Sequence, residues 1–137
     1  MRNVRSHEMK TTILILAMAA MIAGCSPAPT TPIPSPSGKY LVHATINREK
    51  SDRTKYLCVR LILTRLTGET ITETQTGASH VHKWAIGWMT NQDVIILQSS
   101  DIGTHAYEIT TNETVSDIPV TPEMENRAQL LKKEKYN

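Results

Sequence analysis

Val-Ile-Ile-Leu-Gln, residues 94–98, is the stretch that decides the fold. Its four consecutive apolar residues lie between two turn-forming stretches, 90–93 and 100–103, which contain asparagine, aspartate, serine and glycine. An uninterrupted apolar run of this length between turns is typical of a strand that is buried on both faces. The sequence therefore predicts a strand over 94–98 at the centre of a sheet.

Alternating patterns predict further strands on both sides of this central strand. Residues 83–89 and 105–110 flank it directly, and upstream lie 40–47, 56–66 and the polar, threonine-rich 70–75, which suits a place near an edge. The side chains that share one face are Val42, Ala44 and Ile46 in the first strand, Leu57, Val59, Leu61 and Leu63 in the second, and Trp84, Ile86 and Trp88 in the strand before 94–98. Short strands separated by turns predict an antiparallel meander.

The end of the chain has a helical pattern over 122 to about 135. Thr121 offers an N-cap in front of a proline at the first helical position. Met124, Ala128 and Leu131 share one helical face. We therefore expect a mainly β domain over 39–137, with a small antiparallel meander sheet and a C-terminal α-helix packed on it. A helix left free for a partner is the alternative, because its apolar stripe is narrow.

The N-terminus has the order of an export signal. Basic residues precede an apolar run over 12–23, which is about a dozen residues long against the roughly 20 that cross a bilayer. Ala23 and Gly24 then supply small residues before Cys25. Met9 is an alternative start to Met1, because 9–25 alone makes a compact signal.

The tetrapeptide Ile22-Ala23-Gly24-Cys25 resembles the lipobox of bacterial lipoproteins. The resemblance implies a signal peptide over 1–24, cleavage between Gly24 and Cys25, and diacylglycerol and N-acyl chains on Cys25 as the only attached groups. Ser26 follows in place of aspartate, which in that family's sorting pattern implies the outer membrane, facing the periplasm, if the host is Gram-negative. The alternative is an ordinary secretory signal in which Cys25 is incidental.

Five prolines follow the cysteine within 26–38. This composition predicts an extended polyproline-type tether over 25–38, spanning roughly 35–40 Å and lifting the domain away from the lipid headgroups. Recognition of the prolines by a partner domain is the alternative to a plain spacer.

The formal net charge is +2, and Arg2, Arg5 and Lys10 against Glu8 supply all of it. From Cys25 onward the chain is neutral. A neutral chain has no electrostatic footprint for nucleic acid and predicts no polybasic patch for anionic lipid. The sequence therefore predicts attachment to the bilayer through the acyl chains, at about 0.8 kcal/mol per buried methylene.

Two stretches resemble blades of the Tol-system periplasmic β-propellers. Ser-Pro-Ser-Gly-Lys-Tyr-Leu-Val at 35–42 is similar to the turn and strand "SPDGKYLV" of those blades, and 84–109 resembles a second unit. A closed propeller needs at least four blades. The resemblance therefore implies a blade-like twisted sheet rather than a propeller, and it implies no functional residue.

Four residues are candidates for a binding site. His80 and His82 share a face of an extended segment and suggest copper or zinc, with His43 and His105 completing the set if neighbouring strands align. Solvated loop histidines are the alternative. Trp84 and Trp88 are expected in the core, and the alternative is that one is an exposed anchor for a protein or glycan.

Catalytic patterns are weak. Ser99, Ser100, Asp101 and His105 are the residue types of a hydrolytic triad, but no nucleophile elbow accompanies them, and turn chemistry explains them better. Cys58 is expected to be a buried, inert thiol, with an intermolecular disulfide or a reactive thiol as the alternative.

The sequence therefore predicts a non-enzymatic envelope lipoprotein in a binding or accessory role, with another envelope protein as its partner. A periplasmic metal-binding protein using His80 and His82 is the alternative. Exposed sheet edges would also allow copies of the chain to associate.

Overall fold

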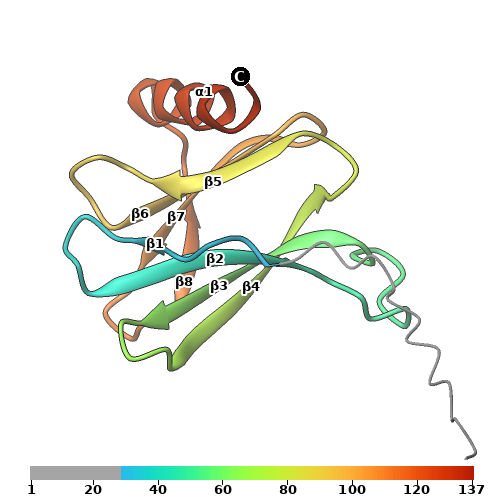
Figure 1. Ribbon diagram of the computed structural model, residues 1–137, viewed down its shortest axis with the longest axis horizontal. Helices are drawn as coiled ribbons and strands as arrows, with labels where there is room; N and C mark the ends of the chain where they lie inside the picture. Colours follow the sequence, from blue (N-terminus) through green and yellow to red (C-terminus); the bar gives the residue numbers. More distant parts are fainter. Residues whose placement is uncertain (1–28) are drawn as a thin grey trace, which may run out of the picture.

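Two four-stranded antiparallel sheets and one helix form three layers in the computed structural model, which describes residues 29–137 (Figure 1). Sheet A consists of β1 (Ile33–Pro34), β2 (Tyr40–Ile46), β3 (Cys58–Arg65) and β4 (Thr70–Ser79). Sheet B consists of β5 (Trp84–Trp88), β6 (Val94–Ser99), β7 (Gly103–Ile109) and β8 (Val115–Ile118), and α1 (Pro122–Tyr136) follows it. The mainly β class, the meander order and the C-terminal helix are confirmed, but the strands divide between two sheets.

Strand β6 is buried along its whole length, as its apolar run predicts. It lies between β5 and β7, so all its main-chain groups can pair within sheet B. Ile95 and Leu97 point toward sheet A, whereas Val94 and Ile96 pack under α1. The central strand therefore joins both layers that cover sheet B.

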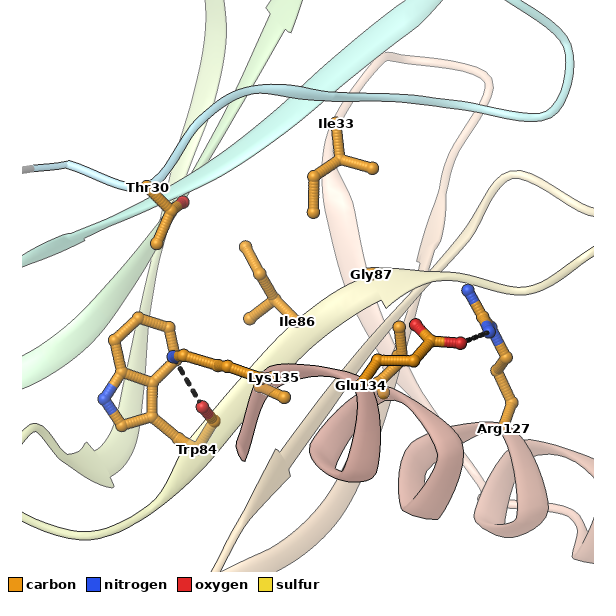
Figure 2. Close-up of a pocket in the computed structure, with 10 residues that line it drawn as sticks. Thr30, Ile33, Trp84, Ile86, Gly87, Arg127, Glu134 and Lys135 are labelled. Carbon is orange, nitrogen blue, oxygen red and sulfur yellow. Dashed lines mark hydrogen bonds and ion pairs between the residues drawn. The ribbon is translucent and has the colours of Figure 1, made fainter. Parts of the chain in front are cut away.

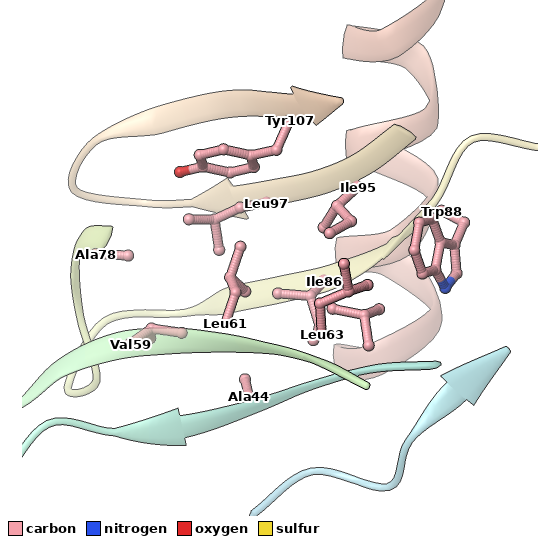
Figure 3. Close-up of a cluster of buried hydrophobic side chains, with 11 residues drawn as sticks. Ala44, Val59, Leu61, Leu63, Ala78, Ile86, Trp88, Ile95, Leu97 and Tyr107 are labelled. Carbon is pink, nitrogen blue, oxygen red and sulfur yellow. The ribbon is translucent and has the colours of Figure 1, made fainter. Parts of the chain in front are cut away.

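The main core lies between the two sheets (Figure 3). Alternation along β3 directs Leu61 and Leu63 inward, where they meet Ile95 and Leu97 of β6. These four side chains are at most 2% exposed. Each contributes about 1.5–3 kcal/mol of burial free energy, as an upper estimate. This contact holds the sheets face to face.

The helix forms as its pattern predicts. Thr121 caps it, because its hydroxyl accepts a hydrogen bond from the main-chain N–H of Met124 at 3.3 Å. Met124, Ala128 and Leu131 are buried against the outer face of sheet B. The alternative of a free helix is therefore wrong.

The second half of the proline-rich segment lies on sheet A. The main-chain N–H of Thr30 donates to the carbonyl of Ala44 at 3.0 Å, and the Thr30 hydroxyl accepts from the Ala44 N–H at 2.8 Å. Ile33–Pro34 then pair with β2 as an edge strand, where a proline that lacks an N–H is tolerated. The predicted tether is therefore attached to the sheet from Thr30 onward, and its residues 25–28 lie outside the described residues.

Two strand limits and one additional strand also differ from the sequence patterns. β3 begins at Cys58, because Leu57 has a positive φ of 61° and leaves the predicted face. β4 continues to Ser79, beyond the predicted 70–75, and stands at the edge of sheet A as expected. β8 was not predicted, because its Val-Ser-Asp-Ile sequence lacks a clear apolar alternation.

Polar side chains tie the two sheets together at their corners. Each contact joins a turn or strand end of sheet A to one of sheet B, and the pairs are Ser37 with Asp93, Arg65 with Glu113, and Ser79 with Asp101. The guanidinium of Arg65 donates twice to Glu113, at 2.9 and 2.5 Å, and this pairing raises the pKa of Arg65. These contacts fix how the sheets are aligned.

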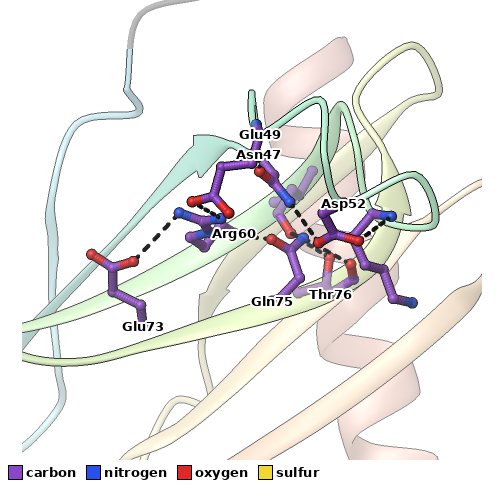
Figure 4. Close-up of polar contacts among 9 residues, drawn as sticks. Asn47, Glu49, Asp52, Arg60, Glu73, Gln75 and Thr76 are labelled. Carbon is purple, nitrogen blue, oxygen red and sulfur yellow. Dashed lines mark hydrogen bonds and ion pairs between the residues drawn. The ribbon is translucent and has the colours of Figure 1, made fainter.

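A polar cluster also stabilises the long loop between β2 and β3 (Figure 4). The buried amide of Asn47 donates to Asp52 at 3.1 Å and accepts from the Glu49 N–H at 2.9 Å. Arg60 of β3 forms an ion pair with Glu49, with its guanidinium 3.4 Å from the carboxylate. The loop is therefore an ordered part of the domain.

Replacing Asp101 with alanine is expected to lower the free energy of unfolding by about 1–2 kcal/mol at pH 7, because the Ser79 N–H and the Ser99 hydroxyl lose their acceptor. Burial acts to raise the pKa of the Asp101 carboxyl, but these hydrogen bonds outweigh it and hold that pKa below its usual range. The contribution is therefore present above about pH 4 and is lost as the pH falls through the folded-state pKa.

Urea unfolding of both proteins at pH 7 and pH 2.5 measures this. The difference between Asp101→Ala and the parent should shrink at the lower pH, and a difference that is equal at both pH values contradicts the assignment. Asp117→Ala, at an exposed carboxylate on β8, is the control, with an expected change within about 0.5 kcal/mol.

Candidate functional site

A groove of about 370 Å³ lies where β1, β5 and α1 meet (Figure 2). Ile33 and Thr30 line it from sheet A, β5 forms its floor, and α1 forms the opposite wall. Its volume is in the range of small ligand pockets. It is therefore the candidate binding site.

The floor of the groove is the outer edge of a strand. β5 is an edge strand of sheet B, so main-chain groups on its outer side have no strand partner. At its start, the N–H of Trp84 donates to the Tyr136 hydroxyl at 3.0 Å, and the carbonyl of Trp84 accepts from Lys135 Nζ at 2.7 Å. At its end, the carbonyl of Trp88 accepts from Arg127 Nε at 2.9 Å. Side chains of α1 therefore cover both ends of this edge.

Ile86 lies between these two covered ends. Alternation along an antiparallel ladder turns its main-chain N–H and C=O to the same side as those of Trp84 and Trp88. Within residues 29–137, no side chain forms a hydrogen bond to these two groups. The middle of the β5 edge is therefore an open donor and acceptor pair in the groove.

Sheet A forms the other wall. The indole Nε1 of Trp88 donates to the carbonyl of Ile33 at 2.9 Å and so joins β5 to β1. Trp88 is only 3% exposed. The expectation that it belongs to the core is confirmed, and its hydrogen bond closes one end of the groove.

Trp84 has a different environment. Its side chain is half-buried and lines the groove. Lys135 Nζ lies 3.5 Å from the centre of its ring, a cation–π contact worth about 0.5–1 kcal/mol. Of the two tryptophans, Trp84 is the one that presents a surface to a ligand.

The wall formed by α1 combines charge with an apolar centre. Arg127 and Glu134 lie 3.6 Å apart as an ion pair, and Lys135 and Leu131 complete the face. These four residues have helical spacing on one side of α1, so the sequence carries a signal for this face, but the apolar pattern predicts only Leu131 among them. Thr30 and Ile33 gave no signal, since only the fold brings them beside the helix.

The histidines do not come together. Nδ1 of His80 lies 3.0 Å from the carbonyl oxygen of Leu57, and His82 is exposed in the turn after β4. His43 lies on β2 and His105 on β7. Within residues 29–137, no three histidine, cysteine, aspartate or glutamate side chains are arranged to hold a metal ion.

The triad-type residues also lie apart. Asp101 accepts hydrogen bonds from Ser99 and Ser79, whereas His105 stacks on Tyr107 and lies 3.8 Å from Asp117. Burial raises the pKa of the Tyr107 hydroxyl. Asp101 is therefore a turn and corner residue.

The Cys58 side chain is buried, as expected, and its thiol lies 3.8 Å from the carbonyl oxygen of Gly77. Burial raises the pKa of this thiol, although nearby Lys55 opposes the shift. A raised pKa disfavours the reactive thiolate.

Gly24, Cys25 and the rest of the predicted signal peptide lie outside the described residues. The one helix in the described part of the chain is neither long nor apolar enough to cross a membrane. Comparison with models of protein families, with curated proteins and with solved structures found no match to this chain.

Replacing Gly87 with alanine is expected to lower the free energy of unfolding by about 1–3 kcal/mol. A Cβ at this position would lie 2.5 Å from Cδ2 of the buried Leu131 side chain, so α1 or that side chain would have to move. Urea unfolding measures the loss. The loss should be smaller in a Leu131→Ala background, because the obstructing methyl groups are gone.

Gly77→Ala is the matched control in another strand. Its added Cβ would come no nearer than 3.4 Å to another atom, so the expected change is within about 0.5 kcal/mol. An equal loss for both substitutions would show that the helix does not approach β5 closely at Gly87.

Proposed function

We propose that this chain is a lipid-anchored bacterial envelope lipoprotein whose β domain, without enzymatic activity, binds an extended segment of another envelope protein. The lipobox resemblance at Ile22-Ala23-Gly24-Cys25 supports the anchor, and Ser26 supports the outer membrane of a Gram-negative host. The groove supports the binding role.

The observation that carries the binding role is the open edge at Ile86. Extended peptides add to exposed strand edges, where main-chain hydrogen bonds supply affinity and pockets for side chains supply specificity. Tyr136 and Lys135 cover one end of the β5 edge and Arg127 covers the other, so a single ligand residue can pair with Ile86. The covered ends also limit indiscriminate pairing between copies.

The groove also favours particular side chains. Ile33, Ile86 and Leu131 offer an apolar centre that suits one aliphatic or aromatic side chain. Arg127 and Lys135 stand at opposite ends of the helical wall and suit carbonyl or carboxylate oxygens on either side of that residue. The favoured ligand is therefore a short extended segment with a central apolar residue.

Substituting Cys25 with serine tests the anchor. The resemblance predicts that Cys25→Ser abolishes the mass increase due to acyl chains and moves almost all of the protein from the membrane fraction to the soluble periplasmic fraction, since two or more acyl chains supply stable anchoring. Intact mass spectrometry and cell fractionation provide the readouts. A Cys25→Ser protein that keeps its membrane location would contradict the proposal, and Cys58→Ser is the control for loss of a cysteine.

Filling the groove tests the binding role. A photo-crosslinking residue in place of Thr30 at the groove is expected to capture one envelope protein through an apolar extended segment, identified by peptide mass spectrometry. Adding Glu134→Trp should reduce this capture at least about tenfold, because the indole would occupy the groove.

Glu123→Trp is the matched control, since it replaces another exposed glutamate of α1 at a position away from the groove. Circular dichroism should show that both variants fold. Capture that is reduced equally by both substitutions, or by neither, would exclude the groove as the binding site.

A further inference from the structure

The charged side chains of the domain are sorted between its two ends. One end, which we call the basic pole, is formed by the loop 47–57, the connection 80–83, the turn 100–103 and the last residues of α1, 132–137. These segments touch one another. The His80 N–H donates to the carbonyl of Leu57 at 3.0 Å, and Lys132 Nζ donates to the Ser100 hydroxyl at 3.0 Å.

The basic pole contains eight lysines and arginines and four aspartates and glutamates. None of these eight cations forms an ion pair within residues 29–137. Two of the acids are paired with arginines that lie outside the pole, Glu49 with Arg60 and Glu134 with Arg127. The positive charges of the pole are therefore not neutralised by contact with a carboxylate in the described part of the chain and can attract an external anion.

The opposite end has no such excess of cations. Its four turns, 35–39, 66–69, 89–93 and 110–114, contain one lysine and three acidic residues, and two of these acids, Glu69 and Glu113, are paired with Arg65 at the end of β3. A neutral total from Cys25 onward predicts no polybasic patch, but the fold gathers the cations at one end. The excess positive charge of the domain therefore lies at one end.

Apolar side chains are exposed among these cations. Val81 is 74% exposed at the tip of the connection to β5, and Tyr56 and Tyr136 are 37% and 38% exposed. Tyrosine is enriched where proteins meet the headgroup layer of a membrane, because its ring is apolar and its hydroxyl is polar. The mixture of cations and amphipathic rings suits an anionic lipid surface.

The chain itself holds this pole near the membrane. Among residues 29–137, Thr30 is the first that bonds to sheet A; it lies next to the end of β2 and lines the groove with Trp84 and Lys135. Thr30 is five positions beyond Cys25, so the two lie at most about 18 Å apart. We propose that the basic pole docks on the anionic phospholipid headgroups of the membrane that holds Cys25, an inference that rests on the proposed lipidation.

Docking sets the orientation of the domain. Each lysine or arginine at the headgroups favours the docked state about fivefold, and the opposite end of the domain is turned away from the lipid. The effect depends on salt, because charges more than about 8 Å apart are screened at physiological ionic strength.

The test uses the full lipidated protein, with acylation of Cys25 confirmed by mass. It is reconstituted in phosphatidylcholine vesicles with or without phosphatidylglycerol, and a dye on Val81→Cys reports contact with a quencher on the lipid headgroups. The docked-to-undocked ratio should rise at least about fivefold with phosphatidylglycerol and fall with added salt. A dye on Ser51→Cys checks the same pole without altering Val81, and Asn91→Cys at the opposite end should show no change.

Charge reversals complete the test. Lys50→Glu should lower the docked ratio by roughly 25-fold, because two charge units change at the pole, whereas Lys39→Glu at the opposite end should leave it unchanged. Quenching at positions 81 and 51 that does not depend on lipid charge overturns the docking inference and leaves the lipoprotein proposal intact.

Two other outcomes also count against docking. Quenching that requires an added envelope protein assigns the pole to a protein partner and overturns lipid docking. A purified protein without acyl chains on Cys25 overturns both proposals.

Discussion

Sheet B must be covered on both faces, and the rest of the structure follows from that requirement. All of β6 is buried, so apolar side chains leave this sheet in both directions. Sheet A covers one face through Leu61 and Leu63, and α1 covers the other through Ala128 and Leu131. A two-layer sandwich would leave Val94 and Ile96 in water, whereas the third layer removes them from it.

The groove forms because α1, the third layer, packs closely on β5. Gly87 lets Leu131 approach β5 more closely than a side chain would permit, so the neighbouring residues of the helix reach the edge of that strand. Arg127 and Lys135 then cover the carbonyls at its two ends. The same helix that completes the core therefore covers both ends of an exposed edge, and within residues 29–137 the N–H and C=O of Ile86 stay open between them.

Much of this arrangement could be predicted from local sequence, because periodicity reports which face of an element is buried. The apolar run 94–98, the Thr121 cap and the buried face of α1 are such cases. The pairing of β1 with β2 could not, since proline suppresses a strand signal even where an edge strand tolerates it. Nor could the division into two sheets or the groove, because both depend on contacts between residues far apart in the chain.

The distribution of charge over the fold also could not be predicted from the sequence, and it has a functional consequence. Net charge is a sum over the sequence, whereas attraction to a surface depends on which charges share one end of the fold. Trp84 and Lys135 line the groove, and Lys135 also belongs to the basic pole. If that pole rests on the headgroups, the groove opens beside the membrane. Its ligand must then come from a segment that lies close to the lipid surface, so an envelope protein with an extended membrane-proximal segment fits both proposals together.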